Sequence, residues 1–119
     1  MQADPHALPQ PPRARRISTS DRLRAALQAL GGGQMRIASH RETAWASITF
    51  AGTRHRLDVL FEGVEGVAAG ETFIEALPEH EFAIRGQLVA DAAVMEVDHC
   101  LTPEPRLAVA VELLLLEDA

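Results

Sequence analysis

Near the start of the chain, apolar residues recur every three or four positions, which is the period of an amphipathic helix. Leu23, Ala26, Leu27 and Leu30 fall on one stripe. The hydroxyls of Ser18, Thr19 and Ser20 can cap the first turn. Three consecutive glycines at 31–33 end the pattern, because glycine readily adopts the left-handed conformation that closes a helix. The pattern predicts a first helix that begins at one of these hydroxyl residues and is stopped by the glycines at 31–33.

Alternating apolar and polar side chains follow, a pattern typical of half-buried β-strands. The alternation divides into three apolar sets: Met35 and Ile37; Ala44, Ala46, Ile48 and Phe50; and Leu57, Val59 and Phe61. A loop at residues 40–43 and a second loop at residues 51–52 would bring all three sets to one face. These positions predict a three-stranded antiparallel meander.

Pro103 and Pro105 mark the loop of a second, longer hairpin, since proline cannot continue a central strand. A loop at residues 102–106 is odd in length, so odd positions face odd positions across the hairpin. In this register Glu96 lies opposite Glu112.

A short second helix is predicted between the two groups of strands, from about Ala69 to Leu77, where Pro78 closes it. The glycines within residues 63–70 are interpreted as a loop. The predicted fold is α+β: a five-stranded antiparallel sheet, made of a three-stranded meander and a long C-terminal hairpin, with two helices. The predicted order is α-β-β-β-α-β-β.

The chain divides into two parts by composition. Residues 1–17 contain four prolines and are predicted to be a flexible Pro/Arg-rich tail, whereas residues 18–119 are predicted to form a single α+β domain. The tail carries Arg13, Arg15 and Arg16 against one acid, a net charge of +2. The domain carries eight arginines against sixteen acids, a net charge of −8. The basic cluster either binds an anionic partner or is a solvated stretch before the fold begins.

The composition excludes several classes of protein. The 119 residues carry a net charge of −6, and a body of that sign repels nucleic acid. Every basic residue is an arginine, which excludes lysine chemistry such as Schiff-base formation. The apolar run Leu113–Leu116 is too short to span a membrane, and the first sixteen residues lack a secretory signal. Since Cys100 is the only cysteine, we expect no intramolecular disulfide and a cytoplasmic protein.

The closing strand predicts an association surface. Val94, Leu114 and Leu116 fall on the face of the hairpin opposite to the predicted core, where an antiparallel sheet normally meets water. Covering each leucine is worth about 1.5–3 kcal/mol, and two helices are too few to cover both faces of the sheet. We therefore expect a second copy of the chain there, as a two-fold homodimer.

Three carboxylates, those of Glu96, Asp98 and Glu112, are the candidate catalytic residues. They share one face in the predicted register, where they could bind a hard cation or share a proton. Structural ion pairs with arginines of the meander are the alternative interpretation of the same cluster.

The candidate ligand-binding residues are Trp45, Arg36, Arg54 and Arg56, on the outer face of the predicted meander. An arginine beside an exposed tryptophan suits a planar anionic ligand. The same arginines can instead pair with the carboxylates, and a tryptophan on a sheet surface is equally typical of an interface.

Two functions remain open from the sequence. The favoured one is a small non-enzymatic cytoplasmic domain that acts by self-association or protein interaction, with no nucleic-acid or membrane partner. The alternative is a small-molecule- or metal-binding protein, or an enzyme, that uses the carboxylate cluster. The five histidines show no metal-ligand spacing, so no metal and no cofactor is predicted.

Overall fold

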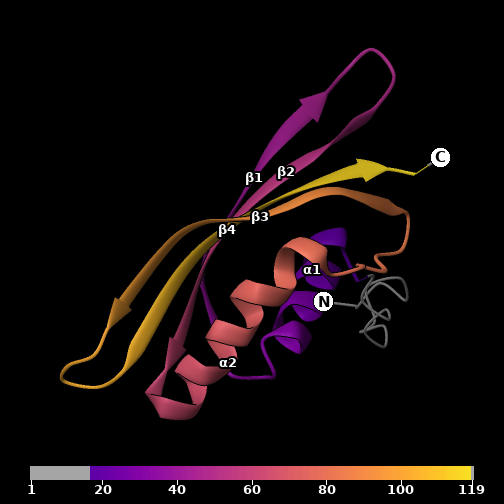
Figure 1. The fold of residues 1–119 in the computed structure, drawn as a ribbon. Helices are drawn as coiled ribbons and strands as arrows, with labels where there is room; N and C mark the ends of the chain where they lie inside the picture. The colour runs from indigo at the N-terminus through magenta and orange to yellow at the C-terminus, as the bar shows by residue number, and fades with distance from the viewer. Residues whose placement is uncertain (1–16, 119) are drawn as a thin grey trace, which may run out of the picture.

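The computed structural model describes residues 17–118, which fold as one antiparallel sheet with two helices on one face (Figure 1). The elements are α1 (Thr19–Leu30), β1 (Met35–Ala46), β2 (Ala51–Glu62), α2 (Gly63–Ala76), the 3₁₀ turn η2 (Leu77–Glu79), β3 (Gln87–Cys100) and β4 (Arg106–Glu117). The strand order is β1-β2-β4-β3, so β1 and β3 are the edges. Apart from Ile17, the predicted tail at residues 1–17 lies outside the described residues.

The predicted α+β class is confirmed, but the predicted number of strands is wrong, because the sheet has four strands and not five. Met35–Ala46 form one continuous strand where a loop was predicted at residues 40–43. The turn expected at residues 51–52 lies instead at residues 47–50. β1 and β2 are therefore a single long hairpin, and the order of elements is α-β-β-α-β-β.

A β-bulge at Ala38 is the reason for this difference. Ile37 pairs with Val59 and Ser39 pairs with Asp58, so Ala38 has no partner on β2. One extra residue reverses the face to which every later side chain points. Odd-numbered apolar residues before the bulge and even-numbered ones after it thus lie on the same face without a loop between them.

The first helix is confirmed, and of the three candidate capping residues Ser18 forms the cap. The backbone N–H of Asp21 donates to Ser18 Oγ at 3.0 Å, and the backbone N–H of Ser18 donates to the Asp21 carboxylate at 3.4 Å. This reciprocal capping box holds the first turn of α1. Leu23 and Leu27 on the predicted stripe are fully buried in the core.

The second helix is longer than predicted, because the glycines that precede the expected start are helical. α2 begins at Gly63, and Gly66 and Gly70 are buried. A Cβ atom on Gly70 would lie 2.8 Å from the Phe61 ring and 2.7 Å from the Leu107 side chain. The absence of side chains at these positions therefore lets α2 pack closely on β2 and β4.

The C-terminal hairpin differs from its predicted register, because its turn lies one residue earlier than predicted and β3 contains two bulges, after Val89 and after Val94. Glu96 lies opposite Ala110 and not opposite Glu112, so the predicted pairing of two like charges is wrong. Val94 was predicted on the face away from the core, but it packs half-buried against the core. The turn of the hairpin spans residues 101–105 in place of the predicted 102–106, which moves Glu96 from Glu112 to Ala110. The bulge after Val94 then turns the Val94 side chain toward the core.

The core fills the space between the helices and the inner face of the sheet. Its fully buried side chains come from every helix and from the two central strands: Leu23, Leu27, Leu57, Phe61, Phe73, Val111, Leu113 and Leu115. The turn of the β1–β2 hairpin and the turn of the β3–β4 hairpin both extend beyond the helices (Figure 1). Within residues 17–118, no helix has the length and apolarity needed to cross a bilayer.

Candidate functional site

The face of the sheet that carries no helix, here called the outer face, divides into three zones along the strands. Paired residues of neighbouring strands point to the same side of a sheet, so the register defines each zone. From the β1–β2 turn toward the β3–β4 turn, the zones are apolar, arginine-rich and acidic.

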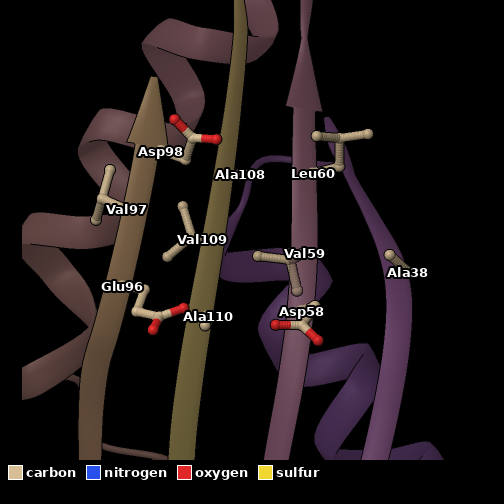
Figure 2. A pocket seen from close by; sticks show the side chains of 10 residues that line it. All are labelled: Ala38, Asp58, Val59, Leu60, Glu96, Val97, Asp98, Ala108, Val109 and Ala110. Atoms are coloured by element: carbon tan, nitrogen blue, oxygen red, sulfur yellow. The ribbon is translucent and has the colours of Figure 1, made fainter. Parts of the chain in front are cut away.

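The acidic zone is a groove of about 480 Å³, here called the acidic groove (Figure 2). Ala108 and Ala110 of β4 form its floor, and the carboxylates of Asp58, Glu96 and Asp98 line it. Ala110 lies opposite both Asp58 on β2 and Glu96 on β3. A short side chain between two longer ones hollows the surface, so the groove follows β4.

The acidic groove holds little positive charge among the described residues. Asp58 accepts a hydrogen bond from the Ser39 hydroxyl at 2.6 Å. Arg56 Nη2 lies 3.8 Å from Glu96 Oε2, and the Glu96 side chain is 77% exposed. Within residues 17–118, no arginine lies within ion-pair distance of Asp98. Among the described residues, Glu96 is thus the only one of the three carboxylates with an arginine within ion-pair distance.

The arginine-rich zone is stabilised by an ion pair between β2 and β4. Arg54 Nη1 donates to Glu112 Oε1 at 2.9 Å, across a pair of half-buried side chains. Arg56 is two residues further along β2, and its Nε atom is buried without a partner among residues 17–118. Arg36 lies outside this zone, on β1 opposite Leu60 of the acidic zone, and its Nη2 atom is 3.4 Å from the Glu62 carboxylate.

The structure therefore separates the residues predicted to form one carboxylate site. Glu96 and Asp98 line the same groove, whereas Glu112 lies in the arginine-rich zone. Asp58 supplies the third carboxylate, which could not be predicted because nothing in the local sequence pattern indicates that β2 pairs with β4. The sequence offered one signal for Asp58: it lies two residues after Arg56, and residues two apart in a strand share a face.

The candidate ligand-binding residues are also distributed over different zones. Trp45 lies in the apolar zone, Arg54 and Arg56 lie in the arginine-rich zone, and Arg36 lies near the far end of the outer face. The four side chains do not form one platform, and Trp45 does not line the acidic groove.

The apolar zone contains Leu116, one of the residues predicted for the dimer interface, and Leu114 lies in the next row, opposite Arg54. Trp45 lies opposite Gly52, Gly52 lies opposite Leu116, and Leu116 lies opposite Leu88, so these positions form one row across the sheet. Leu116 is only 6% exposed and is thus covered within the protomer. Leu114 is half-buried and Leu88 is 54% exposed, so both are accessible.

The turn of the β1–β2 hairpin exposes two large apolar side chains. Ile48 is fully exposed, and Phe50 is 47% exposed. Phe50 and Ala51 form a second groove with Leu88, with a volume of about 450 Å³. The turn itself is ordered by Ser47, whose Oγ accepts the backbone N–H of Phe50 at 3.0 Å. An ordered turn that presents apolar groups to water is typical of a contact surface.

Both edge strands carry bulges, after Ile37 in β1 and after Val89 and Val94 in β3. A bulge interrupts the regular row of N–H and C=O groups that an added strand would need. Addition of another strand at either edge of the described sheet is therefore disfavoured.

On the inner face, a chain of hydrogen bonds links α1 to the sheet. Arg24 Nη1 lies 2.9 Å from His40 Nδ1, and His40 Nε2 lies 2.8 Å from His55 Nδ1. Arginine can only donate, so His40 Nδ1 accepts and the proton on His40 Nε2 is donated to His55. The remaining N–H of His55, at Nε2, is buried without a partner among residues 17–118.

The surroundings of His40 and His55 favour the neutral form of both imidazole rings. Burial lowers the pKa of His40, and the nearby positive charge of Arg24 lowers it further. Burial is also the main cause that lowers the pKa of His55. A proton added to His40 would have to occupy Nδ1, which already faces the Arg24 guanidinium.

His40, Glu42 and His55 bring three possible metal-ligand atoms within 4.8 Å of one another. A metal bound at His40 Nε2 would require the ring proton to move to Nδ1, where Arg24 offers a donor and not an acceptor. Glu42 already accepts a hydrogen bond from the Ser20 hydroxyl at 2.9 Å. The donor set fits a structural link between α1 and β1 better than a metal site.

No protein-family model matches the sequence, and no curated protein matches it either. Among solved structures, a chain of the "Virion of native gene transfer agent (GTA) particle" has a similar fold, with a TM-score of 0.55. The match covers 85% of this chain and 92% of that chain, at 15% sequence identity. The two chains therefore share the fold of the whole domain.

Proposed function

We propose that this chain is a structural subunit of a virion-like particle and acts by binding other protein subunits. The observation that carries the proposal is the similarity of fold to a chain of the gene transfer agent particle, which extends over 92% of that chain. The exposed apolar side chains of Ile48, Phe50 and Leu88 support it, because removing apolar groups from water at an interface is energetically favourable.

The proposal includes association between copies, with a two-fold homodimer as its smallest form. Of the residues predicted for the interface, Leu114 is the direct contact that we propose, since Leu116 and Val94 pack within the protomer. Leu88 and Phe50 extend the contact toward the hairpin turn. We retain the cytoplasm as the proposed compartment.

Sedimentation velocity over a hundredfold range of protein concentration tests the proposal, with electron microscopy of the same samples. We expect species heavier than the 12.9 kDa protomer, in a proportion that increases with concentration. A uniform 12.9 kDa monomer at every concentration, without larger particles in the micrographs, would contradict it.

A second proposal assigns the acidic groove to a small cationic molecule or a divalent metal. The observation that favours it is the convergence of Asp58, Glu96 and Asp98 on one groove. A thermal-shift screen of divalent chlorides and cationic metabolites tests it. A rise in Tm that Asp98→Asn abolishes would support this function, and no rise with any compound would contradict it.

A further inference from the structure

We propose that the acidic groove binds the basic segment of residues 13–16 of a second copy of the chain. This inference rests on the proposed function, because it names the partner of one surface of an associating subunit. Three observations support it: the shape of the groove, the opposite charges of the groove and of residues 13–16, and the distance between Ile17 and the groove of the same protomer.

The shape of the groove suits an arginine side chain. Neighbouring strands lie about 4.8 Å apart, so Asp58 on β2 and Glu96 on β3 stand roughly 10 Å apart across β4. Ala108 and Ala110 leave a flat apolar floor between them, on which the aliphatic stem of an arginine can lie. The planar guanidinium then reaches a carboxylate at the side of the groove and can bind it through two N–H groups.

The groove also needs positive charge. Glu96 and Asp98 lie two residues apart on β3, with Asp58 on the other side of β4, so their like charges repel one another and a cation between them is favourable. Arg56 approaches Glu96 only to 3.8 Å, and no arginine within residues 17–118 pairs with Asp98. Residues 17–118 carry eight arginines against sixteen acids, whereas residues 1–16 carry three arginines against one acid. The basic segment thus complements the acidic face.

The basic segment cannot reach the groove of its own protomer. Ile17 lies beside Ala83 and Arg85, just before β3 begins, on the side of the sheet that carries the helices. Glu96 lies nine residues into β3, about 30 Å along the strand at 3.3 Å per residue, and it points to the outer face. The four residues from Ile17 back to Arg13 span at most about 14 Å. The arginines must therefore come from another copy.

Charge reversal in the full chain tests this contact. The segment variant is Arg13→Glu/Arg15→Glu/Arg16→Glu, and the groove variant is Glu96→Arg/Asp98→Arg. The control is Glu71→Arg/Glu75→Arg, which makes the same charge change on the exposed side of α2. Sedimentation velocity of each variant is measured at low and at high ionic strength.

We expect the segment variant and the groove variant each to associate about tenfold or more weakly than the wild type at low ionic strength, and the control to associate normally. An equimolar mixture of the two variants should regain association, because each supplies the charge that the other has lost. High ionic strength should weaken the wild type in the same direction.

Three results would overturn the inference. If the segment variant and the groove variant both associate as strongly as the wild type, this contact is excluded, whereas the proposed function still stands. Two weakened variants that do not associate on mixing would exclude the contact between copies. If a chelator abolishes association but the segment variant still associates, the groove binds a metal and not the basic segment. A wild type that is monomeric under all conditions would instead remove the proposed function itself.

Discussion

His40 Nε2 lies 2.8 Å from His55 Nδ1, and this hydrogen bond joins the edge strand β1 to a fully buried position of the central strand β2. Arg24 of α1 donates to the other nitrogen of His40, so the same chain of bonds fastens the first helix to the sheet. Its direction requires both imidazoles to be neutral, which couples the stability of this region to pH.

The free energy of unfolding should decrease as the pH falls below about 6.5. The pKa values of His40 and His55 are lowered by folding, so the unfolded chain binds more protons in the window between the folded and unfolded values. The contribution is complete above the unfolded pKa and is lost as the pH falls through the folded pKa. Urea unfolding at a series of pH values measures it. Arg24→Gln should weaken the dependence, and an unchanged slope would argue against the role of Arg24.

Two glycine substitutions in α2 should have opposite effects on stability. Gly70→Ala should lower the free energy of unfolding by about 1–3 kcal/mol, because the new Cβ would lie 2.7 Å from Leu107 and 2.8 Å from Phe61. Gly66→Ala is the matched control: its Cβ meets the Phe61 backbone at 3.4 Å, so helix propensity should raise stability by about 0.5–1 kcal/mol. Chemical unfolding compares the two. Equal effects would mean that α2 does not pack as closely as described.

Leu116→Glu and Leu114→Glu should affect different properties. Leu116 is 6% exposed, so a carboxylate there should lower the free energy of unfolding by about 2–4 kcal/mol. Leu114 is half-buried, so its substitution should change stability by less than about 1 kcal/mol and weaken self-association instead. Thermal unfolding and sedimentation separate the two quantities. A dimer that survives Leu114→Glu unchanged would place the interface elsewhere.

Ile48→Asp should reduce association without affecting the fold. The side chain is fully exposed in the protomer, so the free energy of unfolding should change by less than about 0.5 kcal/mol. If the hairpin turn is a contact, association should weaken about tenfold or more, as measured by sedimentation. Val64→Asp, at a 75% exposed position of α2, is the matched control. Equal behaviour of the two variants would exclude the turn from the interface.

Much of the architecture could be predicted because it depends on local chemistry. The hydroxyls of Ser18, Thr19 and Ser20 predict the region where α1 starts, and the apolar stripe with its glycine stop predicts the end. The α+β class follows from the same kind of pattern. The strand count did not follow, because Ala38 adds one residue to β1 and thereby imitates the effect of a loop on the alternation.

The candidate site was predicted only in part. Glu96 and Asp98 are two residues apart on one strand, so their presence on one face follows from the period of a strand. Asp58 joins them only because β2 and β4 are neighbours in the sheet. His40 was predicted in a loop, whereas it lies in β1 with its ring bonded to His55.

By itself, the sequence determined the elements that short-range chemistry controls: the capped first helix, the strand-forming alternation, and the contrast between a basic start and an acidic body. The register of β1 and β3 and the groove along β4 depend on contacts between strands that are distant in the sequence, so they are seen only in the folded chain. The physical reason is that a bulge has no local signal, since an extra residue is recognised only when the partner strand leaves it unpaired. Likewise, an alanine becomes the floor of a groove only when longer side chains flank it on both neighbouring strands.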